Sequence, residues 1–157
     1  DGLVEAYAIG GAVAAAAYLE AFETEDLDVF VILPGQGSIV DLGPVWLALL
    51  ARGGVPRGAY VELHGVPVQL LGPDALAEDG IRAASRHQLG SLTIPILPAE
   101  HLAALALDLG RAKDSRRLLD FLEWPGFDHD RFRTLVDRFG LAAKWDVFRR
   151  RFLESAR

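Results

Sequence analysis

Apolar and polar positions divide the chain into a front part with strand-like runs and a back part with helical periodicity. In the front part, short apolar runs bounded by Gly, Pro and charged residues predict strands. The run 27–33 (LDVFVIL) is the most apolar of these and predicts a buried central strand that ends at Pro34. Strands are predicted at 27–33, 58–63, 66–71 and 91–97, and at 3–9, where the end of a helix is the alternative.

Helical patterns separate these runs and then fill the rest of the chain. Three features mark helix starts: Pro44 in a first turn, and Asp74 and Asp114 as N-caps, because a carboxylate can accept the free N–H groups there. A fourth start is capped by Asp128 or Asp130. Helices are predicted at 11–22, 43–52, 74–87, 99–109, 114–124, 130–139 and 141–155. Pro95 places the strand 91–97 at an edge of the sheet or puts the proline at the strand's end.

Strands in the first half and helices in the second half predict an α+β fold. The length of 157 residues fits one domain, 1–157, with a mixed-sheet part at 1–98 and a helical part at 99–157. The absence of Cys excludes disulfides, zinc–thiolate sites and cysteine nucleophiles. No apolar run is long enough for a membrane span and no signal peptide pattern is present, so we expect a cytoplasmic protein. The richness in Ala, Leu, Gly and Arg suggests a bacterial source.

Charge is unevenly distributed along the chain, whose net charge is −6. Residues 1–110 contain 4 Lys/Arg against 14 Asp/Glu, and residues 111–157 contain 12 against 8. The acidic front part is compatible with a metal site and argues against a broad nucleic-acid surface there. The basic back part favours solvated helix faces, with phosphate or an acidic partner as alternatives. In 144–152 (KWDVFRRRF), the aromatic residues have helical spacing and are expected to pack inward, with the arginines on the other side.

Two short motifs in the front part carry candidate chemistry. Gly10 and Gly11 lie where a strand ends and a helix begins, so a ligand could approach the backbone closely. Asp26 and Asp28 are two apart, and on a strand their side chains point to the same face. Paired carboxylates suit a hard cation such as Mg²⁺, which also binds phosphates. The alternatives are a plain tight turn for the glycines and a solvated strand start for the aspartates.

The order of these motifs resembles the nucleotidyltransferase superfamily related to DNA polymerase β. The Gly-Gly turn, a helix and then T-x-D-x-D (Thr24, Asp26, Asp28) leading into an apolar strand match that family's metal-binding pattern. The segment 101–114 resembles its downstream helix pair with a G-R-x-K-D turn, and 66–71 occupies the place of its third-carboxylate strand. The match is nearest to small bacterial nucleotidyltransferase-like proteins, including the toxin-type enzymes of abortive-infection systems.

The resemblance implies a short mixed sheet flanked by helices, with a C-terminal helical extension. It also implies Mg²⁺ as cofactor, a nucleoside triphosphate (NTP) as ligand, and transfer of a nucleotidyl group to an RNA end or a protein hydroxyl. The residues that it implies for the site are Asp26 and Asp28 as metal ligands and catalytic groups, and Gly10, Gly11, Thr24, Gln69, Arg111 and Lys113 as nucleotide-binding groups. Glu62, on the neighbouring strand, is the candidate for a third catalytic carboxylate.

The chain departs from the family pattern at three positions. Gln69 stands where active relatives have Asp or Glu, Ala106 where they tend to have Lys, and Phe22 where many have Arg. A neutral amide coordinates a metal weakly and cannot accept the acceptor's proton. Two interpretations follow: either Glu62 on the neighbouring strand supplies the third carboxylate, or the protein is a catalytically inactive binding or regulatory module. A third is an unrelated α+β interaction domain.

Two residues of the G-R-x-K-D turn have structural alternatives. Arg111 could bridge to the acidic strand or reach a triphosphate, and Lys113 could belong only to a helix–helix turn. Other chemistries find no support. The four His residues lack metal-ligand spacing, and the loop 34–38 lacks the Lys of a phosphate-binding P-loop.

Overall fold

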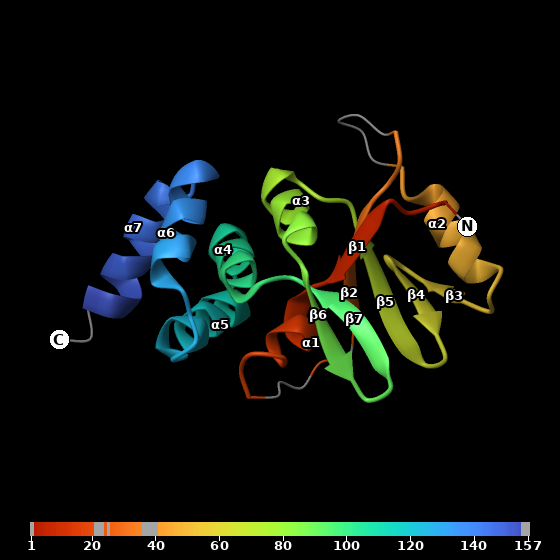
Figure 1. Cartoon of the computed structure of the whole chain (residues 1–157), viewed down its shortest axis with the longest axis horizontal. Helices are drawn as coiled ribbons and strands as arrows, with labels where there is room; N and C mark the ends of the chain where they lie inside the picture. The colour runs from red at the N-terminus through yellow and green to blue at the C-terminus, as the bar shows by residue number, and fades with distance from the viewer. Residues whose placement is uncertain (1, 21–23, 25, 36–40, 155–157) are drawn as a thin grey trace. The chain divides into compact units, whose positions relative to one another are not determined.

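The computed structural model describes residues 2–20, 24, 26–35 and 41–154 (Figure 1). The chain forms two compact units, Asp1–Leu97 and Pro98–Arg157. The first unit contains a mixed sheet with three helices, and the second contains helices. The expected α+β class, with a C-terminal helical region, is confirmed. Among the described residues, no helix combines the length and the apolar character needed to cross a membrane.

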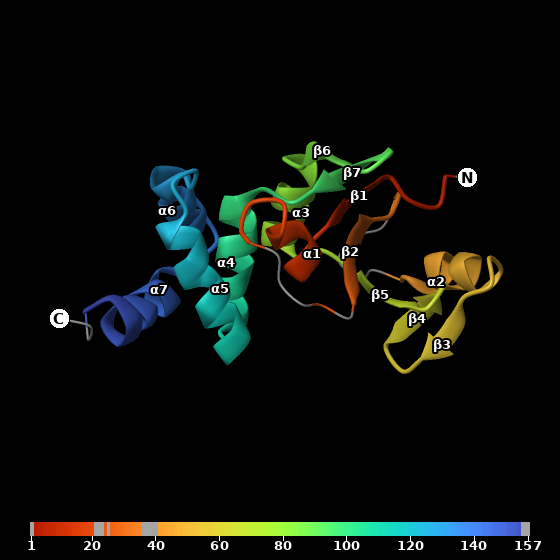
Figure 2. The same ribbon diagram turned by 90° about the horizontal axis from the view of Figure 1, so that it is seen from below.

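The sheet of the first unit has β2 (Leu27–Ile32) at its centre, as the apolar run 27–33 predicted. Among the described residues, seven strands lie in the order β3-β4-β5-β2-β1-β7-β6 (Figures 1 and 2). β2 pairs antiparallel with β1 and parallel with β5, which makes the sheet mixed. The other strands are β1 (Ala6–Ile9), β3 (Val55–Arg57), β4 (Tyr60–Leu63), β5 (Val66–Leu71), β6 (Ser85–Leu89) and β7 (Leu92–Ile96).

Three short helices pack on this sheet: α1 (Gly11–Ala15), α2 (Gly43–Leu50) and α3 (Ala75–Arg82). α1 and α3 contact β2, and α2 contacts β4. Two predicted helix starts are confirmed. Pro44 lies in the first turn of α2, and the Oδ1 of Asp74 accepts the backbone N–H of Ala77 at 2.8 Å, which caps α3.

The Ala-rich helix predicted at 11–22 was too long, because α1 ends at Ala15. After Ala15 the backbone tightens into turns, and the hydroxyl of Tyr18 donates to the carbonyl oxygen of Leu97 at 3.1 Å. This hydrogen bond ties Tyr18 to the segment that follows β7, so the chain leaves the helical path. Position 22 and the loop residues 36–38, to which sequence-based predictions extended, lie outside the described residues.

The helix predicted at 74–87 was also wrong at its end. α3 stops at Arg82, and β6 begins at Ser85 as one arm of a hairpin with β7. The cross-strand hydrogen bonds of that hairpin outweigh the local helical pattern, and β7 is therefore internal, not an edge. Pro95 is the second-to-last residue of β7, in agreement with the strand-end alternative. β3 was missed because it is three residues long and contains Pro56, which an edge strand tolerates.

The second unit consists of α4 (Ala99–Leu109), α5 (Ala112–Glu123), α6 (His129–Arg138) and α7 (Ala142–Phe148), followed by a π-helical turn at Arg149–Glu154. α4 contacts α5, α6 and α7 and forms the centre of this unit. The core between these helices contains fully buried Leu118 and Phe121 and nearly buried Phe132. α4 ends at Gly110, whose φ of 65° is the left-handed conformation that glycine adopts at helix ends.

Two predictions concerned helix caps in the second unit. Asp128 caps α6, because its Oδ1 accepts the N–H groups of Asp130 and Arg131 at 3.1 and 2.9 Å. The N-cap predicted at Asp114 was wrong, since α5 begins at Ala112. Asp114 lies inside the first turn, is 1% exposed, and pairs with Arg111. A buried carboxylate needs such a partner, and the arginine three residues earlier supplies it.

Candidate functional site

The Gly-Gly turn and the first residues of β2 lie against each other. The N–H of Gly10 donates to the carbonyl oxygen of Asp28 at 2.9 Å. Gly11 has a φ of 59°, and a Cβ at this position would overlap the carboxylate of Asp28. The Asp28 side chain therefore fills the space that any other residue at position 11 would need. Glycine at position 11 is required both by backbone conformation and by contact with Asp28.

At position 10, packing and not backbone conformation requires glycine. Its φ of −118° suits any residue, but a Cβ would overlap the ring of Phe30, which lies on the same face of β2 as Asp28. Sequence reasoning did not find Phe30, because only strand pairing brings it beside the turn. The two glycines thus have a packing role against β2 in addition to the ligand role expected for them.

Asp26 lies just before β2 and is oriented by Thr24. The Thr24 hydroxyl is 3.0 Å from Oδ1 of Asp26 and 3.1 Å from its carbonyl oxygen. Asp26 and Asp28 are both half-buried and Thr24 is exposed. The three polar residues of T-x-D-x-D therefore occupy one end of the central strand, with a hydroxyl fixing the first carboxylate.

Gln69 is the cross-strand neighbour of Asp28. β2 and β5 are parallel, and their register pairs Asp28 with Gln69. Paired residues on adjacent strands lie about 4.8 Å apart and point to the same face. A carboxamide therefore stands beside Asp28 at the position where the resemblance places a third carboxylate.

Glu62 lies on the same face of the sheet but one strand further away. It pairs with Pro67 across β4 and β5, two residues from Gln69. Its Oε2 is 3.4 Å from the Nε of Arg57, and both side chains are substantially exposed. The Arg57 partner was missed by sequence reasoning, although the tight turn at Gly58 and Ala59 is the signal that folds β3 back onto β4.

The two faces of these strands differ in burial. Val31, Val61 and Val68 point to the opposite face and are almost completely buried. Asp28, Gln69 and Glu62 are half-buried on the other face, which we call the open face, although Ile32 further along β2 on this face is buried. The three polar side chains therefore keep partial access to solvent.

The acidic residues suit a metal ion that is brought by a ligand. Among the described residues, no three His, Cys, Asp or Glu side chains lie close enough to hold a metal ion by themselves. Mg²⁺ usually keeps several waters and binds one or two carboxylates together with substrate phosphates. Asp26 and Asp28 fit that donor requirement, whereas a site made only of protein carboxylates does not fit the described residues.

Arg111 and Lys113 belong to the second unit, at the start of α5. The Nη2 of Arg111 is 3.2 Å from Oδ1 of Asp114, and its Nε contacts Oδ2, so the guanidinium holds this carboxylate with two hydrogen bonds. The guanidinium is itself about half-exposed, and Lys113 is exposed. Ala106, one of the departures from the family pattern, is buried in α4.

Comparisons with known proteins support the fold. The sequence matches no protein family model and no curated protein. Among solved structures, the chain is similar to an antigenic nucleotidyltransferase-like protein from Paracoccidioides brasiliensis, with a TM-score of 0.50 and 14% identity over 88% of this chain and 83% of that chain. The chain has a nucleotidyltransferase-like fold. At this identity the likeness concerns the fold alone, and the toxin-type branch and bacterial source stay predictions.

Proposed function

We propose that this chain binds an NTP together with Mg²⁺ at the end of β2 that carries Asp26 and Asp28. The observation that carries the proposal is the contact of the Asp28 carboxylate with Gly11, beside Asp26. The Asp28 carboxylate lies against the glycine turn, and Asp26 is the residue directly before β2, in a sheet with a nucleotidyltransferase-like fold. The excess of acidic residues in positions 1–110 favours the binding of a cation over that of a free anion in this unit.

Each residue has a distinct part in this binding. A bound Mg²⁺ would neutralise phosphate charge and link the phosphates to the carboxylates. Thr24 holds Asp26 in place, and Gln69 offers an amide N–H₂ donor next to Asp28 for a phosphate or sugar oxygen. Gly10 and Gly11 are proposed as phosphate contacts of the turn; Gly11 is half-buried, whereas Gly10 is buried and its N–H donates to the carbonyl oxygen of Asp28. α1 has only five residues, so the turn matters more here than a helix dipole. Arg111 and Lys113, which belong to the second unit, stay sequence-based candidates for phosphate contacts.

Isothermal titration calorimetry with each of the four NTPs and Mg²⁺ tests the proposal. Asp26→Asn and Asp28→Asn should each weaken binding by about tenfold or more, because charge-assisted contacts to the metal are lost. Asp41→Asn is the matched control: it removes a carboxylate of the same unit, and its amide oxygen still accepts from the N–H of Gly43. If the intact protein binds no NTP with Mg²⁺, the proposal fails.

Nucleotidyl transfer is the second candidate function, with Glu62 as the candidate base on β4, one strand beyond Gln69. Glu62 shares the open face with Asp28 and Gln69. In this reaction the oxygen of an acceptor hydroxyl, on an RNA end or a protein, forms a bond to the α-phosphorus of the NTP. The bond to the leaving pyrophosphate breaks, and Glu62 accepts the hydroxyl proton. Without a working Glu62 the same site would bind nucleotide and serve as a regulatory module.

A further inference from the structure

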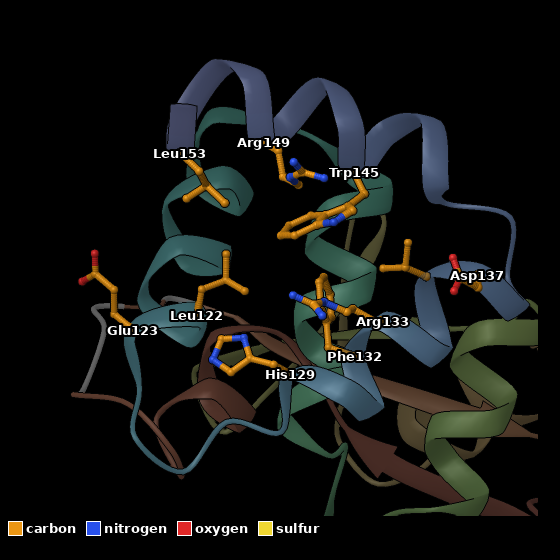
Figure 3. Close-up of a pocket in the computed structure, with 10 residues that line it drawn as sticks. Leu122, Glu123, His129, Phe132, Arg133, Asp137, Trp145, Arg149 and Leu153 are labelled. Carbon is orange, nitrogen blue, oxygen red and sulfur yellow. The ribbon is translucent and has the colours of Figure 1, made fainter. Parts of the chain in front are cut away.

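The second unit contains a cavity between α5, α6 and α7 that the proposed function does not use. Its volume is about 690 Å³, within the range of small-molecule sites. Figure 3 shows its lining side chains, which come from these three helices and the π-helical turn. Apolar groups from Leu122, Phe132, Trp145 and Leu153 make up much of the wall.

Trp145 is held in place by other aromatic rings. Its ring centroid is 5.2 Å from that of Phe132, edge to face, and 5.8 Å from that of Phe148, which lies nearly parallel to it. Phe132 and Phe148 are almost fully buried, whereas Trp145 is partly exposed and lines the cavity. A fixed, partly exposed indole is a surface on which a planar ring can stack at little entropic cost.

Two arginines bring positive charge to the same cavity. In the view of Figure 3, the Trp145 indole lies between the guanidinium groups of Arg149 and Arg133, and Glu123 and Asp137 lie at opposite edges. Arg149 pairs with Glu154 at 2.8 Å. Arg133 makes no hydrogen bond or ion pair with any residue that the structure describes. A neutral apolar ligand would cover Arg133 without giving it a partner, which is unfavourable.

We propose that this cavity binds a nucleoside monophosphate unit, with the base stacked against Trp145 and the phosphate held by Arg133. An aromatic wall beside two guanidinium groups matches a planar ring that carries an anion. The volume accommodates a base, a sugar and a phosphate together. The unit can be a free mononucleotide or the terminal nucleotide of a single-stranded RNA, since both present the same chemistry. This site lies in a different unit from Asp26 and Asp28 and needs no metal ion.

The test is titration of the whole protein in EDTA, followed by tryptophan fluorescence and calorimetry. The probes are AMP, adenosine, inorganic phosphate, phenyl phosphate and a short oligoadenylate. AMP should bind, and adenosine, inorganic phosphate and phenyl phosphate should each bind at least about tenfold more weakly, because each lacks the base or the phosphate. Tighter binding of the oligoadenylate than of AMP would assign the site to an RNA end, and equal or weaker binding would assign it to a free mononucleotide.

Variants separate this site from the metal site. Arg133→Ala should weaken AMP binding by about tenfold, and Trp145→Phe should remove most of the fluorescence change while it keeps the ring packing. Arg116→Ala is the matched control, because Arg116 is exposed, pairs with Asp120 and does not line the cavity. Asp28→Asn should leave AMP binding in EDTA unchanged. Absence of AMP binding, equal binding of phenyl phosphate, or equal losses in Arg133→Ala and Arg116→Ala would overturn the assignment.

Discussion

The two glycines before α1 are fixed by the side chains of β2. Gly11 is in the left-handed region and leaves room for the Asp28 carboxylate, and Gly10 leaves room for the ring of Phe30. A larger residue at either position would push a β2 side chain out of place. The same contacts that pack α1 on β2 therefore also position a proposed metal-binding carboxylate.

Gly11→Ala is expected to lower the free energy of unfolding by about 1–3 kcal/mol, from backbone strain at positive φ together with displacement of Asp28. Binding of NTP with Mg²⁺ should weaken as well. Gly90→Ala is the matched control, because Gly90 has a φ of 60° and nothing lies within 4 Å of its Cβ position. Urea unfolding and calorimetry provide the two readouts. Equal binding by the two variants would mean that the Asp28 position does not matter for the nucleotide.

At the scale of elements, strand register decides what surrounds Asp28. The parallel pairing of β2 with β5 puts Gln69 beside it, and the antiparallel pairing of β5 with β4 puts Glu62 on the same face, one strand further away. A shift of one residue in either pairing would turn these side chains to the core face. Nucleotidyl transfer at this sheet therefore requires that the Glu62 carboxylate on β4 extends to the acceptor hydroxyl, whereas nucleotide binding does not.

The substitution Glu62→Gln tests whether this carboxylate acts as the base. If Glu62 accepts the hydroxyl proton, transfer of label from an NTP to RNA or protein should fall by about 100-fold or more, while NTP binding stays unchanged. Glu78→Gln, which changes an exposed acid on α3, should retain the full rate. A Glu62→Gln rate equal to that of the unmodified protein would rule out Glu62 as the base and leave nucleotide binding as the function.

At the scale of the whole molecule, the chain divides into two compact units. The first is built on a sheet that pairs distant strands, and the second on helices packed around α4. The proposed metal-dependent site lies in the first unit and the proposed mononucleotide cavity in the second. Substitution of a buried residue in one unit is therefore expected to lower the stability of that unit more than that of the other.

Phe121→Ala should destabilise the second unit by about 3–5 kcal/mol, because Phe121 is fully buried and its removal leaves a cavity. We expect amide hydrogen exchange to accelerate in residues 98–157 and to change much less in residues 1–97. Val61→Ala, at a fully buried position of the first unit, should give the opposite pattern. Equal acceleration in both units after either substitution would show that the chain unfolds as a single cooperative body.

Local signals in the sequence predicted a large part of this fold. The central strand 27–33, the helices of the back part and the Asp74 cap depend on apolar periodicity and on side chains within one turn. Helix ends were less accurate, as α1 shows, because Tyr18 hydrogen-bonds to Leu97, a residue far along the chain. Patterns that span only a few residues contain no information about such partners.

By itself, the sequence determined the α+β class, the central strand and the acidic pair at its start, because each depends on residue types and spacing within a short segment. Tertiary structure alone decided that 85–89 is a strand, that Asp28 packs on Gly11, that Arg57 holds Glu62 and that Arg111 holds Asp114. The hydrogen bonds of the strand 85–89, the Asp28–Gly11 contact and the Arg57–Glu62 ion pair all form between separate elements. At Asp114 it is burial by the surrounding helices that makes the carboxylate need its arginine.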